Sequence, residues 1–85
     1  MKHATEEARS RIKPLLGRLR RISALQERSA GVFYLRSKAF LHFHEHGEEV
    51  YADIKVGDEW RRVPATSEAD WEKVLALTAT NVTPK

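Results

Sequence analysis

The chain of 85 residues contains no cysteine. This absence excludes a disulfide framework, a zinc ribbon and a thiol nucleophile together, and it suits a reducing compartment. The first ten residues are polar and carry Glu6 and Glu7, so they lack the apolar stretch of a signal peptide. No run approaches the roughly 20 apolar residues of a membrane span. We therefore expect a cytoplasmic protein that does not bind a membrane.

Glycine is also scarce, and the four glycines at positions 17, 31, 47 and 57 are too scattered to form a phosphate-binding loop. No serine lies in a G-x-S-x-G nucleophile elbow, and we assign no catalytic residue. A chain of this length supports one hydrophobic core. We expect a single domain over residues 1–85, and a non-enzymatic binding or accessory function.

Positive charge is concentrated near the start of the chain. Residues 1–28 hold eight Lys or Arg against three acids, a net charge of +5, whereas residues 29–85 carry a net charge of −2. A basic helix attracts phosphate backbones or an acidic protein. The candidate contacts are Arg18, Arg20, Arg21 and Arg28. Arginine is also a good helix former on a solvated face, and the chain has neither a helix-turn-helix pair nor aromatics interleaved with lysines.

An apolar stripe at spacings of three and four predicts an amphipathic helix in this basic segment. The stripe consists of Ala8, Ile12, Leu15, Leu16, Leu19, Ile22 and Leu25. Proline is tolerated in the first turn of a helix, so the helix should begin near Arg11 to Pro14 and run to about Glu27. Residues 1–10 are then either a mobile tail or a kinked extra turn that begins near Thr5.

Four strands are predicted next, at residues 32–35, 39–44, 50–56 and 59–63. The sequence from Ser67 to Asp70 resembles a capping box, which predicts a last helix that begins there and frays over residues 81–85. The expected fold is therefore α+β. It is an antiparallel meander of about four strands with an N-terminal and a C-terminal helix packed on one face, in the order α-β-β-β-β-α.

The second and third predicted strands form a hairpin with Gly47 at its tip. A two-residue loop would pair Phe43 with Val50, and a four-residue loop would pair Phe43 with Ala52. A slip by one residue would exchange the two faces of the hairpin. Both registers therefore keep the same apolar side chains on one buried face: Leu41, Phe43, Val50, Ala52 and Ile54.

The opposite face of this hairpin is polar. It carries His42, His44 and His46 in an H-x-H-x-H pattern, beside Asp53 and Glu49. Two imidazoles at positions i and i+2 with a carboxylate predict a divalent metal site formed by His42 and His44 with Asp53 or Glu49. A His–Asp or His–Glu pair could instead perform acid–base chemistry, and a solvated strand can carry histidine with neither role.

The stretch from Gly31 to Val56, GVFYLRSKAFLHFHEHGEEVYADIKV, resembles the strand region of small bacterial proteins related to the MmcQ/YjbR group. In that group a helix precedes a strand, a Lys-x-Phe element and a hairpin, and Lys38-Ala39-Phe40 matches the Lys-x-Phe element. The resemblance implies a CyaY-like α/β fold. It also implies a DNA-binding role, which has been proposed for the group by analogy.

Two further expectations concern packing and assembly. Trp60 and Trp71 should pack in the core and at its rim rather than form a base-stacking platform, because small domains need large aromatic side chains to fill their cores. An exposed sheet edge or an uncovered sheet face could also join two copies, with the basic segment of one copy meeting the acidic segment of the other. A homodimeric interaction module is therefore an alternative to the binding functions above.

Overall fold

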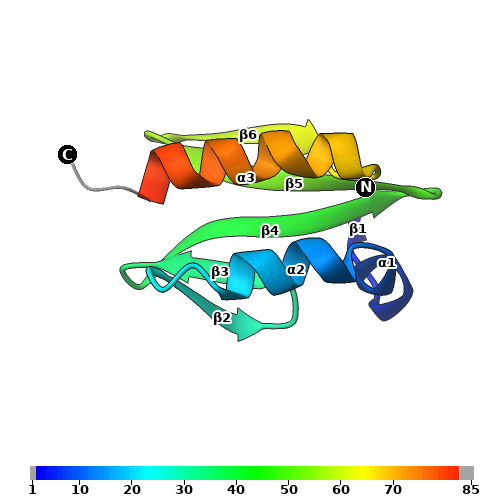
Figure 1. Cartoon of the computed structure of the whole chain (residues 1–85), viewed down its shortest axis with the longest axis horizontal. Helices are drawn as coiled ribbons and strands as arrows, with labels where there is room; N and C mark the ends of the chain where they lie inside the picture. Colours follow the sequence, from blue (N-terminus) through cyan, green and yellow to red (C-terminus); the bar gives the residue numbers. More distant parts are fainter. Residues whose placement is uncertain (1, 83–85) are drawn as a thin grey trace.

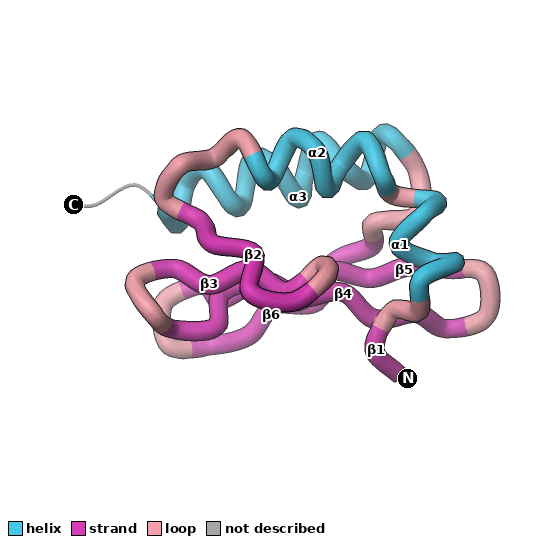
Figure 2. Tube along the Cα trace, turned by 90° about the horizontal axis from the view of Figure 1, so that it is seen from below, coloured by secondary structure: helices cyan, strands magenta, loops and turns pink. Residues whose placement is uncertain are grey.

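The computed structural model describes residues 2–82. It has two layers, a β-sheet and a layer of helices packed against it (Figure 1). The helices are α1 (Glu6–Arg11), α2 (Lys13–Arg20) and α3 (Glu68–Val82). The strands are β1 (Lys2–His3), β2 (Leu25–Ser29), β3 (Val32–Leu35), β4 (Lys38–His46), β5 (Glu49–Val56) and β6 (Glu59–Pro64). Helices α2 and α3 lie side by side on one face of the sheet, and no helix of residues 2–82 covers the other (Figure 2). We call this second surface the open face.

The sheet is antiparallel, with the strand order β2-β3-β4-β5-β6. Strand β1 lies outside this order and pairs with the second half of β4, where His3 lies opposite His44. Strand β3 pairs with the first half of β4 on the same side. Strand β4 is therefore the central strand, paired with β5 on one side and with β3 and β1 in turn on the other.

The α+β class and the helices at both ends of the chain are confirmed, but the first helix is shorter than predicted. Helix α2 ends at Arg20. Of the residues expected to continue it as far as Glu27, residues 21–24 form a turn and the last three lie in strand β2. Leu25 fits the helical spacing and is buried, but it lies opposite Leu35 in a strand. Pairing with β3 outweighs the local helical pattern here, and the meander has five strands rather than four.

The segment before Pro14 takes the second of its two predicted forms, the kinked extra turn that begins near Thr5. The Thr5 hydroxyl caps α1 by accepting a hydrogen bond from the Ala8 amide. Ile12 separates α1 from α2, and Pro14 occupies the first turn of α2, where its missing amide hydrogen leaves no helical bond unmade. Met1 lies outside the described residues.

The hydrophobic core lies between the helices and the sheet. Its largest fully buried apolar side chains are Phe33, Ile12, Leu15, Leu19, Leu41, Ile54, Val50 and Val74. The predicted apolar stripe is buried except for Ile22, which is partly buried. No helix among residues 2–82 combines the length and the apolar character needed to cross a membrane.

The last helix begins as predicted. The Ser67 hydroxyl accepts a hydrogen bond from the Asp70 amide at 3.2 Å, and the Asp70 carboxylate accepts one from the Ser67 amide at 3.0 Å. The first turn of α3 is thereby capped from both directions. Residues 81–82 are still helical, and the rest of the stretch expected to fray lies outside the described residues.

The hairpin of β4 and β5 follows the second predicted register, in which Phe43 lies opposite Ala52. The ladder continues to His46 opposite Glu49, so the turn itself contains only two residues. One of them, Gly47, has a φ of +63°, a left-handed conformation that favours glycine.

A β-bulge interrupts the pairing of β3 with β4. Phe33 lies opposite Leu41, but the next residue of β3, Tyr34, lies opposite Ala39, so Phe40 is the extra residue on β4. Phe40 and Leu41 are both buried although they are adjacent in the strand. The alternation of β4 therefore changes phase at this point.

Replacement of Gly17 by alanine should stabilise the protein. Gly17 lies inside α2, and a Cβ atom added there would meet no atom within 4 Å. We expect Gly17→Ala to raise the free energy of unfolding by about 0.5–1 kcal/mol, because alanine loses less backbone entropy in a helix. Urea unfolding midpoints would measure the change.

Gly47→Ala is the matched control, because its added Cβ also meets open space but its φ is positive. This variant should be less stable than the parent chain. A destabilising Gly17→Ala would contradict the assignment of residue 17 to a regular helix interior.

Candidate metal centre on the open face

Three histidine side chains meet on the open face. His42 and His44 lie on β4, and His3 lies on β1 directly opposite His44. One ring nitrogen from each histidine lies within 4.8 Å of the other two. The ring centroid of His44 is 4.8 Å from that of His3 and 4.9 Å from that of His42. The alternation that buries Leu41 and Phe43 directs these imidazoles to the opposite surface.

Asp53, on the neighbouring strand β5, holds His44 in place. The Nε2 atom of His44 is 3.0 Å from Oδ2 of Asp53. Arg62 on β6 donates two hydrogen bonds to the same carboxylate, from Nε to Oδ1 at 2.8 Å and from Nη2 to Oδ2 at 2.9 Å. The hydrogen bonds from Arg62 hold the pKa of Asp53 below its ordinary value, although burial acts in the opposite direction. A charged, buried carboxylate thus fixes the orientation of the His44 ring.

The Nδ1 atoms of His42 and His44 are buried, and neither has a hydrogen-bond partner among residues 2–82. A buried polar atom without a partner destabilises a fold by about 1–3 kcal/mol. With the proton of His44 on Nε2, toward Asp53, the Nδ1 atom carries a lone pair. Burial lowers the pKa of His42, although the charge of Asp53 opposes this effect. The lowered pKa favours the neutral form of the His42 ring, which is the form that binds metals.

His3 reaches the cluster because its segment is tied to β4. The Ala4 amide donates to the Phe43 carbonyl at 3.1 Å, which extends the pairing of β1 by one step. The Thr5 amide donates to the Glu45 carboxylate at 2.6 Å. These two bonds position the exposed imidazole of His3 beside the two imidazoles of β4.

The residues predicted as metal ligands are only partly brought together. His42 and His44 lie in the cluster, and Asp53 contacts His44 from behind. The Glu49 carboxylate lies outside the cluster and accepts a hydrogen bond from the Tyr51 hydroxyl. His46 lies opposite Glu49 and is exposed, also outside the cluster.

His3 was not predicted, and neither was the role of Arg62. The sequence near His3 contains no strand pattern, and its place depends on pairing with a strand far along the chain. The one available signal was that His3 is the single histidine outside the H-x-H-x-H segment. Arg62 could have been placed opposite Asp53 by extending the meander register to β6.

Three of the four arginines predicted to contact nucleic acid or an acidic protein have side-chain partners among residues 2–82. Arg18 on α2 forms an ion pair of 2.9 Å with Glu72 on α3. The guanidinium of Arg28 lies over the ring of Tyr34, 4.6 Å from its centroid. Arg21 is exposed and caps the end of α2 through its backbone amide.

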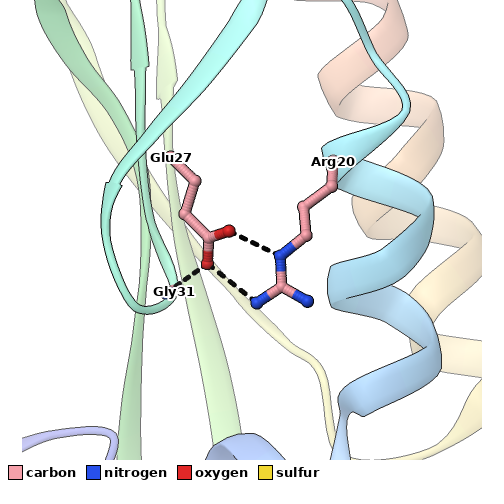
Figure 3. A network of polar contacts seen from close by, with 3 residues as sticks. All are labelled: Arg20, Glu27 and Gly31. Atoms are coloured by element: carbon pink, nitrogen blue, oxygen red, sulfur yellow. Dashed lines mark hydrogen bonds and ion pairs between the residues drawn. The ribbon is translucent and has the colours of Figure 1, made fainter.

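The fourth of these arginines, Arg20, contacts Glu27 (Figure 3). Its Nη2 atom donates to one Glu27 oxygen at 3.0 Å, and the Gly31 amide donates to the same oxygen at 2.8 Å. The hydrogen bond from Arg20 lowers the pKa of Glu27, with smaller contributions from Gly31 and from the charge of Arg9, while burial acts in the opposite direction. This contact ties the end of α2 to the turn between β2 and β3.

No family model, no curated protein and no solved structure matches this chain. The resemblance to the MmcQ/YjbR group and the role it implies stay predictions.

Glu27→Gln should destabilise the protein in a pH-dependent way. We expect a loss of about 1 kcal/mol at pH 7, because the charged contact with Arg20 disappears. The pKa of Glu27 is lowered by folding, so its contribution is complete above the ordinary carboxyl value of 4.5 and is lost as the pH falls through the lowered value. Urea unfolding of both proteins at decreasing pH should show the difference between them shrinking.

Glu72→Gln provides the control, because Glu72 pairs with Arg18 in a more exposed place. Its effect at pH 7 should be the smaller of the two. A Glu27→Gln deficit that does not change with pH would contradict the assigned contact.

Proposed function

We propose that this protein binds a divalent transition-metal ion through His3, His42 and His44. The observation that carries this proposal is the pair of buried, unpartnered Nδ1 atoms of His42 and His44 within a cluster of three imidazoles. A metal ion would give these nitrogens the partner that no residue in the described range 2–82 provides.

The donor set favours zinc, nickel or copper, because imidazole is a suitable ligand for these ions. Zinc binds a histidine nitrogen at roughly 2.0–2.1 Å. The three nitrogens, now within 4.8 Å of one another, would therefore draw closer together around an ion. Three protein nitrogens would leave the fourth position of a tetrahedral ion open to water or to another ligand.

Asp53 supports metal binding in a second way. A carboxylate that accepts the second ring N–H of a metal-bound histidine fixes the ring and makes it a stronger ligand. The contact of His44 with Asp53 has this arrangement, and Arg62 in turn keeps the carboxylate charged. The same His–Asp pair would suit acid–base chemistry, but that role leaves the convergence of His3 and His42 unexplained.

Nucleic-acid binding through the basic helix is less well supported. Arg18 and Arg20 already face the carboxylates of Glu72 and Glu27. A phosphate would have to displace these carboxylates. Breaking an exposed ion pair costs little, but exchanging it for an ion pair with phosphate contributes little free energy to binding.

Titration with zinc should perturb the side-chain resonances of His42, His44 and His3 in NMR spectra. His42→Ala and His44→Ala should abolish binding, and His3→Ala should weaken it roughly tenfold or more, because each removes one nitrogen ligand. His46→Ala should bind like the parent chain, since His46 lies on the same strand but outside the cluster. Unchanged histidine resonances at millimolar zinc, or an equal loss in His46→Ala, would rule the proposal out.

Asp53→Asn should weaken zinc binding by about 10–100-fold, because the ring of His44 loses its charged acceptor. Glu49→Gln, on the same face, should leave the affinity unchanged, since the Glu49 carboxylate is hydrogen-bonded to Tyr51. Isothermal titration calorimetry would give both affinities, and a urea midpoint for each variant would show that it is folded. Equal affinities for the two variants would exclude a supporting role for Asp53.

A further inference from the structure

A cavity of about 510 Å³ lies at the end of the sheet, between the β3–β4 turn and the β5–β6 turn. Three cationic residues line it: Arg36, Lys38 and Lys55, with Asp58 as an acidic neighbour. Trp60 forms an aromatic wall. At 44% exposure, it is the one large apolar side chain that residues 2–82 expose. The cavity therefore combines excess positive charge with an accessible indole ring.

The positions of these groups are defined by the sheet. Trp60 lies opposite Lys55 in the β5–β6 ladder, and the Lys55 Nζ atom lies 5.2 Å from the centroid of the indole ring. The other face of the sheet holds the core, so Trp60 lies on the open face, where its ring is 4.9 Å from that of His42. Trp71, by contrast, is buried, and its indole donates to the Ala65 carbonyl.

The turn that presents Arg36 has an unfavourable backbone. Arg36 and Ser37 have φ angles of +52° and +71° and form the two-residue turn between the paired residues Leu35 and Lys38. Such hairpin turns favour Asn-Gly, because most side chains avoid positive φ. An arginine in this position is not explained by the needs of the turn, which points to a role for its side chain.

We propose that this cavity binds a phosphorylated nucleoside, either free or as the end of a single strand. The base would stack on Trp60, since aromatic side chains provide stacking surfaces for bases. The phosphate would pair with Arg36 and Lys38, with Lys55 close to the ring. An inorganic anion would not use the exposed part of the indole, and an uncharged aromatic ligand would not use the charges of Arg36 and Lys38.

This site shares no residue with the histidine cluster, so it goes beyond the proposed metal function. The experiment is therefore run with EDTA, which separates its result from metal binding. The probe is adenosine 5′-monophosphate, added to the full chain while the two indole N–H resonances are followed by NMR. The Trp60 resonance should shift on titration, and that of the buried Trp71 should not.

Charge-removing variants locate the phosphate. The affinity of the double variant Lys38→Gln/Lys55→Gln for the nucleotide should fall by about tenfold or more, because two cations are removed. Lys73→Gln, an exposed lysine on α3, should bind like the parent chain. Arg36→Asn/Ser37→Gly should fold at least as well as the parent chain, because these residues suit the turn, yet it should lose affinity.

Further arms distinguish the source of the ligand. A Trp60 shift with the mononucleotide identifies a free nucleotide. A shift only with a 5′-phosphorylated single-stranded oligonucleotide, with the same dependence on Lys38 and Lys55, identifies a strand end. Inorganic phosphate or adenosine binding as tightly as the nucleotide would overturn the proposal. An unchanged Trp60 resonance in both titrations would also overturn it. So would a loss of nucleotide affinity in Lys73→Gln as large as that in Lys38→Gln/Lys55→Gln.

Discussion

Successive side chains of strand β4 point to opposite faces of the sheet, and both the core and the histidine cluster depend on this alternation. Leu41 and Phe43 point toward the helices and are buried, so His42 and His44 point to the open face. Strand β5 pairs along one side of β4, and β3 and β1 pair along the other. A slip by one residue would expose the two apolar side chains, at about 1.5–3 kcal/mol each, and bury two imidazoles.

The open face is organised around the carboxylate of Asp53. Asp53 contacts His44 on one neighbouring strand and Arg62 on the other, so three adjacent strands are joined by one charged group. The side chain of Asp53 is only 9% exposed, which makes these partners necessary for a charge at this depth. Trp60 lies two residues before Arg62 on β6 and contacts His42, so the histidine cluster and the cationic cavity are neighbours.

The sequence pattern correctly predicted those features that are determined by the spacing of residues within one helix or strand. The apolar stripe from Ala8, the alternation of residues 50–56 and the capping box at Ser67 were readable, because each is set by the period of one element. The sequence did not reveal strand β2, because Leu25 satisfies the helical spacing and only its pairing with β3 makes it a strand. His3 and the lysines around Trp60 were missed for the same reason: distant segments are joined by strand pairing.

The bulge at Phe40 separates the two ends of β4. The bulge keeps Ala39 opposite Tyr34 and Lys38 opposite Leu35, so β3 determines which way the first half of β4 faces, whereas β5 fixes the orientation of His42 and His44. Removal of Phe40 would therefore make the ladder with β3 regular and leave Lys38 on the same side of the sheet, but the core would lose a buried aromatic side chain. The two halves of β4 are thus kept in phase by different neighbouring strands, and the bulge is the point where the two patterns meet.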